Sequence, residues 1–113
     1  IHVNLGLLKK HHNRNVDSGS KTVKVELMGI KVGDFVLTTF PGELSVETGM
    51  NIKRKAKHKL TYVSGVTNGY IYYTPTAKQL NNIGGAQEDS DCFLAPEWQG
   101  IYEDKAVEIV NSL

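Results

Sequence analysis

One carboxylate and a group of polar and aromatic side chains are the residues of this sequence with the clearest chemical potential. Glu43 directly follows a Pro-Gly pair, and Asn68, Tyr70 and Tyr73 lie close together later in the chain. A carboxylate can bind a metal or act as a general base, and a phenol can bind a metal or stabilise an oxyanion. The competing interpretation is structural, because an acid is also favoured in the first turn of a helix and tyrosines can form an aromatic lid.

The helices and strands predicted around these residues indicate that Glu43 and the tyrosines lie close together in the fold. Residues 35–40 form an apolar run bounded by turn signals and read as a buried strand, residues 43–56 as a helix, and residues 60–66 as a second strand. A strand, a helix and a strand of these lengths predict a right-handed βαβ unit with parallel strands. Because parallel strands end at the same edge of the sheet, we expect Glu43 to face the segment 67–76 there, where open α/β sheets bind ligands.

The flanking segments complete the predicted fold. Residues 21–28 alternate apolar and polar side chains, which predicts a half-buried strand, and residues 29–34 predict a tight reversal into strand 35–40. Residues 76–82 predict a short helix, and Pro96 is expected to begin the last helix. Its apolar stripe is predicted to be Trp98, Tyr102, Ala106, Ile109 and Leu113, with Glu103, Asp104, Lys105 and Glu108 mostly outside. The fold class is therefore α/β, with α+β as the alternative: a mixed sheet with a β-hairpin, a βαβ unit and a C-terminal helix.

Length and composition limit the function classes. The 113 residues amount to a single domain or a fragment of a larger catalytic domain, with residues 1–20 as a poorly defined arm or loop. A net charge of +1 gives no general attraction to nucleic acid, and the basic cluster 53–59 is better explained as a solvated helix end than as a nucleic-acid patch. No apolar run is long enough for a transmembrane segment. The start at Ile1 suggests a fragment, a processed chain or a chosen boundary.

The histidines do not complete a metal site. A catalytic zinc needs about three protein ligands, which typically include His. None of the residues His2, His11, His12 and His58 is expected beside Glu43 or Tyr73, and the adjacent pair His11 and His12 is expected in a solvated loop. Cys92 is the one cysteine, so no internal disulfide is available. The segment therefore looks like part of an active site rather than all of it.

Two motifs, in order, resemble the neutral/alkaline (non-lysosomal) ceramidase family, especially its bacterial members. The first is Gly33-Asp34, an apolar strand and Pro41-Gly42-Glu43; the second is Gly65-Val66-Thr67-Asn68-Gly69-Tyr70-Ile71-Tyr72-Tyr73-Thr74-Pro75-Thr76. Gly84-Gly85, an acidic loop and a closing helix continue the resemblance, which covers roughly residues 21–113. The sequence departs from the family at Tyr72, where bacterial relatives often have Gly, and at Ala86-Gln87, which replace the usual Tyr.

The resemblance implies a zinc-dependent amide hydrolase that acts on ceramide or a related lipid-like amide. It implies Glu43 and Tyr73 as zinc ligands, Tyr70 close to the metal, and Asn68 holding the loop. The family's zinc-binding histidines and catalytic serine lie upstream and have no match here, so the segment alone is predicted to be inactive. Its partner would be the upstream part of the catalytic domain, and apolar area exposed on a fragment favours self-association. A secreted or periplasmic location would follow from the family. The alternative is a non-catalytic binding or structural module that retains the fold.

Overall fold

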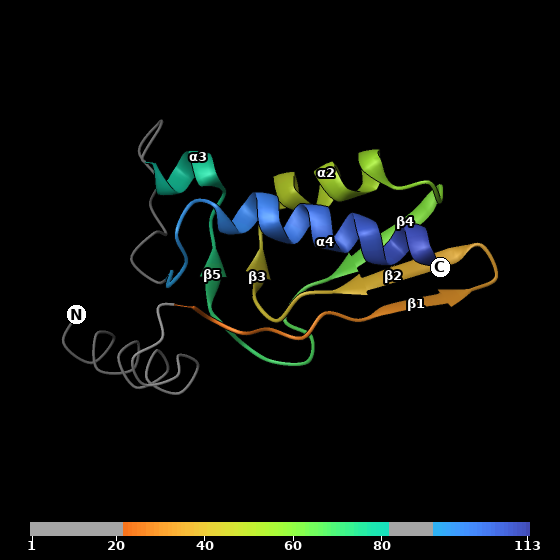
Figure 1. The fold of residues 1–113 in the computed structure, drawn as a ribbon, viewed down its shortest axis with the longest axis horizontal. Helices are drawn as coiled ribbons and strands as arrows, with labels where there is room; N and C mark the ends of the chain where they lie inside the picture. The colour runs from red at the N-terminus through yellow and green to blue at the C-terminus, as the bar shows by residue number, and fades with distance from the viewer. Residues whose placement is uncertain (1–21, 82–91) are drawn as a thin grey trace.

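The computed structural model describes residues 22–81 and 92–113 (Figure 1). The predicted arm 1–20, with His11 and His12, and most of the polar loop that contains Gly84-Gly85 lie outside the described residues. Within the described ranges, none of the helices combines the length and the apolar character that a membrane crossing requires.

A mixed three-stranded sheet forms the centre of the fold. Its strands are β1 (Gly29–Val32), β2 (Phe35–Thr39) and β4 (Leu60–Ser64), in the order β1-β2-β4. β1 and β2 pair antiparallel, and β2 and β4 pair parallel with Phe35 opposite Leu60. The predicted α/β class, the hairpin and the parallel strand pair are confirmed.

The helices α2 (Val46–Lys55) and α4 (Trp98–Ser112) cover one face of this sheet (Figure 1). The buried side chains between helices and sheet include Val36, Ile52 and Ala106, each completely inaccessible to solvent. Phe40 packs against Trp98 and Tyr102, with ring centroids 5.5 and 4.3 Å away. Trp98 thus belongs to the core, as its place in the predicted apolar stripe indicates.

The opposite face of the sheet is apolar and largely exposed, and the Lys53 side chain of α2 contacts it on the edge strand, over the Tyr62 ring. Because side chains alternate along a strand and paired residues share a face, one side of the sheet carries Ile30, Val32, Phe35, Leu37, Leu60 and Tyr62. Five of these six are 41–68% exposed, and the rings of Phe35 and Tyr62 stack at 5.0 Å. We call these six residues the outer apolar face. Parallel strand pairs are normally buried on both faces.

The first strand lies later in the chain than predicted. The strand expected at 21–28 is wrong, because the reversal is confined to Gly33-Asp34 and the ladder therefore forms on Gly29–Val32. Gly33 has a φ of +57°, which suits the first position of a two-residue hairpin turn. β2 ends at Thr39, whose amide donates to the Met28 carbonyl at 3.0 Å, so the residues before Met28 lie beyond the end of β2.

Two further predictions need correction. The helix expected from residue 43 begins at Val46, because Ser45 caps it: the Ser45 hydroxyl accepts a hydrogen bond from the Thr48 amide at 3.3 Å. Glu103, expected on the exposed side of the last helix, is 6% exposed, whereas Asp104, Lys105 and Glu108 are exposed as predicted. That helix begins at Trp98 rather than at Pro96.

Candidate functional site at the β3–β5 pair

Glu43 and Tyr73 lie side by side on a separate two-stranded sheet. Glu43 belongs to β3 (Glu43–Leu44) and Tyr73 to β5 (Tyr73–Thr74), which pair parallel with Glu43 opposite Tyr73. Glu43 is therefore a strand residue and not, as predicted, part of the first helical turn. Paired residues of neighbouring strands project to the same face, so the two side chains point to the same side. The predicted meeting of these two segments is thus observed, in a strand pair that the sequence did not indicate.

Close backbone contacts fix this pair in place. The Glu43 amide donates to the Tyr72 carbonyl at 2.9 Å, and the Thr74 hydroxyl donates to the Glu43 carbonyl at 2.8 Å. A side chain at Gly42 would meet the Phe40 ring at 2.9 Å and the Tyr72 carbonyl at 3.0 Å. Only glycine at this position allows the two segments to approach so closely, which gives the Gly of the Pro-Gly-Glu motif a structural reason.

The loop between β4 and β5 holds three non-glycine residues in the left-handed region. The φ angles are +49° at Val66, +60° at Asn68 and +65° at Tyr72. Such conformations are uncommon, and for a β-branched residue such as Val66 they carry a clear steric cost. Hydrogen bonds to the segment before β3 hold the loop in this form, with Val66 donating to the Gly42 carbonyl at 3.0 Å and Ile71 to the Pro41 carbonyl at 2.7 Å. Strain of this kind clusters at functional sites.

Tyr70 contacts the carboxylate directly. Its hydroxyl donates a hydrogen bond to Oε1 of Glu43. This bond, with smaller effects of desolvation and of the charge on Glu43, raises the pKa of Tyr70 to about 12. Tyr70 is therefore a neutral donor near pH 7, and it orients the carboxylate of Glu43.

Asn68, which has a predicted role, and Tyr72, which has none, lie around this group. The side-chain amide of Asn68 donates to Glu26 at 3.0 Å, which ties the loop to the segment before β1. Tyr72 packs between aromatic rings, 5.0 Å from Tyr70 and 5.3 Å from Phe93. The structure thus brings Glu43, Tyr70 and Tyr73 together, while the side chain of Asn68 contacts Glu26.

A groove of about 620 Å³ opens beside the pair, with both Glu43 and Tyr73 in its lining. We call it the α2 groove because one side of α2 lines it over most of the helix. Its volume is in the usual range for small-molecule sites. Further lining residues come from α2 and the residue before it, from the end of β4 and the residues after it, from β5 and Pro75, and from α3 (Ala77–Leu80). They include Ser45, Val46, Met50, Lys53, Val66 and Gln79.

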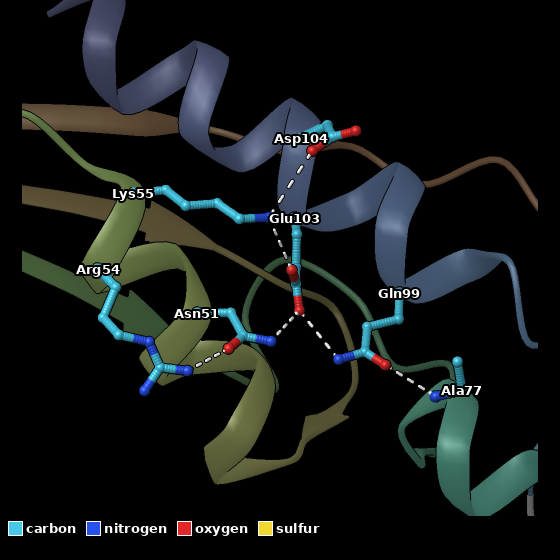
Figure 2. Close-up of polar contacts among 7 residues, drawn as sticks. All are labelled: Asn51, Arg54, Lys55, Ala77, Gln99, Glu103 and Asp104. Atoms are coloured by element: carbon cyan, nitrogen blue, oxygen red, sulfur yellow. Dashed lines mark hydrogen bonds and ion pairs between the residues drawn. The ribbon is translucent and has the colours of Figure 1, made fainter.

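A polar network from α4 fixes the connection that follows Tyr73 (Figure 2). The indole nitrogen of Trp98 donates to the Pro75 carbonyl at 2.8 Å, and the Gln99 side chain accepts a hydrogen bond from the Ala77 amide at 2.8 Å. Gln99 in turn donates to Glu103 at 2.9 Å. This network holds β5 and α3 against the core at two successive points.

Glu103 is the centre of that network. Its Oε1 accepts from Asn51 at 2.7 Å and its Oε2 from Lys55 at 3.1 Å, both on α2 (Figure 2). Burial alone raises the pKa of Glu103, but the hydrogen bonds from Asn51, Gln99 and Lys55 outweigh it and leave the pKa below its ordinary value. The sequence pattern places Glu103 on the exposed side of the last helix, because charged residues are usually exposed, so its role is not visible in the sequence.

The pair fits part of a metal site. Carboxylate and phenol oxygens are both donors that zinc accepts, and the Tyr70 hydroxyl orients the carboxylate as outer-shell partners of metal ligands do. Within residues 22–81 and 92–113, no group of three or more His, Cys, Asp or Glu residues is placed to hold a metal. Glu43 and Tyr73 would supply two oxygen donors at this point, and a complete zinc site would need further donors.

Comparison with known proteins adds no family assignment. No protein-family model matches this sequence, and no curated protein gives a significant match to it.

Proposed function

We propose that this chain is the C-terminal part of a ceramidase-like, zinc-dependent amide hydrolase and that it supplies two ligands of the metal. The observation that carries the proposal is the pairing of Glu43 with Tyr73 on adjacent strands, at the mouth of the α2 groove. Both residues are the ones that the family resemblance selects, and they are distant in sequence. The strained loop that carries Asn68 and Tyr72 adds support, since strain is retained where geometry matters for function.

The roles of the individual residues follow from their contacts. Glu43 and Tyr73 would hold the metal through oxygen, and Tyr70 would keep the carboxylate of Glu43 in one orientation. Asn68 would anchor the loop through Glu26. A bound zinc would supply Lewis-acid polarisation of the amide carbonyl and activation of the attacking group. The substrate class is a lipid-like amide such as N-acylsphingosine.

The outer apolar face supports the view that further polypeptide completes the site. Two donors are too few for a catalytic zinc, and a parallel strand pair with one bare apolar face lacks a packing layer. One upstream segment that packs on this face and brings the remaining ligands would meet both needs.

Zinc content is the direct test. In the longest parent chain that contains residues 1–113, Glu43→Gln and Tyr73→Phe should each lower the bound zinc and the hydrolysis of N-acylsphingosine by tenfold or more. Glu47→Gln is the matched control, since that side chain is exposed and is not a proposed ligand. Unchanged zinc stoichiometry and hydrolysis in the Glu43 and Tyr73 variants would refute the proposal and leave a non-catalytic binding or structural module.

The isolated chain gives a second measurement. Calorimetric titration of residues 1–113 with zinc should show weak binding, because only part of the ligand set is present. A sub-micromolar dissociation constant for this chain alone would contradict the split site.

A further inference from the structure

The α2 groove has a polar group at one end and an apolar wall along its length. Glu43 and Tyr73 lie at the end near the start of α2. From there Val46, Gly49, Met50 and Lys53 follow one side of the helix at spacings of three and four residues. With a rise of 1.5 Å per residue, Val46 and Lys53 are roughly 10 Å apart along the helix axis.

The apolar residues of this stripe do not serve the protein core. Val46 is 81% exposed and Met50 is 44% exposed, while the core side of α2 is provided by Thr48 and Ile52, which are completely buried. Gly49 has no atom within 4 Å of the position that a side chain would occupy. The middle of the groove is therefore open and apolar, which suits a narrow hydrocarbon chain.

The far end of the groove is positively charged. Among the described residues that line it, Lys53 is the one basic residue and Glu43 the one acidic residue. The Lys53 ammonium lies 5.0 Å from the centre of the Tyr62 ring. Tyr62 belongs to the outer apolar face and does not line the groove, so this cation–π contact places the ammonium at the rim. A ligand that spans the groove thus meets a cation at the end opposite Glu43.

We propose that the α2 groove binds an acyl amide whose chain ends in a carboxylate, and that Lys53 selects for this end. The amide would lie beside Glu43 and Tyr73, the hydrocarbon chain along Val46 and Met50, and the carboxylate at the Lys53 ammonium. Charge complementarity at Lys53 carries the proposal. The position of the amide rests on the proposed function, whereas the carboxylate site at Lys53 does not.

Binding without zinc tests the carboxylate site by itself. The full 113-residue chain, free of zinc, is titrated with suberic acid monoamide and with octanamide, its uncharged match, while chemical shifts of backbone amides are recorded. The monoamide should bind about fivefold more tightly than octanamide, the size expected for a partly exposed charge pair, with shifts along α2. Lys53→Met should abolish this preference and leave octanamide binding unchanged.

Two further variants sharpen the result. Lys78→Met, an exposed lysine of α3 outside the groove lining, should retain the preference. Gly49→Leu should weaken both ligands, because the new side chain enters the open middle of the groove. Equal binding of the two ligands to the wild-type chain, a preference that survives Lys53→Met, or shifts away from α2 would overturn the proposal.

The outcomes separate this inference from the proposed function. Unchanged zinc content and hydrolysis in the Glu43 and Tyr73 variants of the parent chain would refute the hydrolase. If the preference for the carboxylate ligand at Lys53 is intact in the same protein, the carboxylate site stands. Zinc binding through Glu43 and Tyr73 without a Lys53 preference would do the reverse.

Discussion

The buried carboxylate of Glu103 makes a prediction about stability that can be worked out from its contacts. It is 6% exposed and accepts hydrogen bonds from Asn51, Gln99 and Lys55, so it joins α2 to α4. Glu103→Ala would leave three donors without their acceptor. Hydrogen bonds to charged groups contribute about 1.5–3 kcal/mol each. The side chain of Lys55 is 51% exposed, so water replaces much of its lost partner.

Counting about 1 kcal/mol for each amide donor and less than 1 kcal/mol for Lys55, Glu103→Ala should lower the free energy of unfolding by about 2–3 kcal/mol. Glu103→Gln keeps an oxygen that can accept from Asn51 and Gln99 but replaces the oxygen that Lys55 contacts. It should therefore cost only about 1 kcal/mol. Glu108→Gln is the matched control, since that side chain is 67% exposed and pairs with Lys105 on the same helix; its effect should stay below about 0.5 kcal/mol.

The assay is urea unfolding followed by the fluorescence of Trp98, the one tryptophan of the chain, which is buried beside Phe40. The dependence of the free energy of unfolding on pH in the acid range provides an independent test. Since the folded-state pKa of Glu103 is lowered, its stabilising contribution is present above the ordinary carboxyl value near 4.5 and is lost as the pH falls through the folded-state pKa. In the Glu103→Gln variant, the free energy of unfolding should therefore fall less steeply as the pH is lowered through this range. Equal unfolding free energies for the Glu103 and Glu108 variants, or an unchanged acid profile, would refute the reasoning.

Two other predictions concern the site and the outer apolar face. Glu43→Gln should bring the pKa of Tyr70 from about 12 back towards 10, because its largest cause is the hydrogen bond to that carboxylate; NMR titration of the tyrosine ring carbons measures it, and an unmoved value would contradict the bond. The isolated chain should self-associate through the outer apolar face, with a weak, concentration-dependent dimer in sedimentation velocity, since exposed apolar patches of this kind favour association. Phe35→Thr combined with Val32→Thr should shift it to monomer, whereas Val46→Thr, an exposed apolar residue in the α2 groove, should not.

The order of apolar runs and helical segments predicted the class of the fold but not the positions of its strand ends. The parallel pairing of strands 35–39 and 60–64 followed from the strand–helix–strand order, because parallel strands need a crossover of this length. The first strand was misplaced because residues 21–28 alternate well, whereas the two-residue turn at Gly33-Asp34 sets which residues can pair with β2. Turn geometry outweighed local pattern at that point.

The burial of a charged residue was the second feature that could not be predicted from the sequence. Glu103 lies three residues from both Gly100 and Ala106 in a helix whose neighbouring acids are exposed, so periodicity alone places it near the boundary between the two sides. Its burial depends on donors from Asn51 and Lys55, which are about fifty residues away in the chain. No pattern within the helix carries that information. A buried acid is tolerated only where such partners exist.

Glu43 illustrates how a correct juxtaposition can follow from a wrong local assignment. Helix propensity and the favourable dipole suggested that this acid begins a helix, which would have left its side chain free to point towards solvent. Instead the Ser45 cap delays the helix, and the two residues before the cap extend alongside Tyr73-Thr74. The resulting strand pair constrains the direction of the Glu43 side chain more tightly than a helix end would, because its partner, its face and its hydrogen bond to Tyr70 are all determined. A carboxylate held in this way suits ligand binding better than a capping role, since a cap needs only proximity to the helix end and no partner on a second strand.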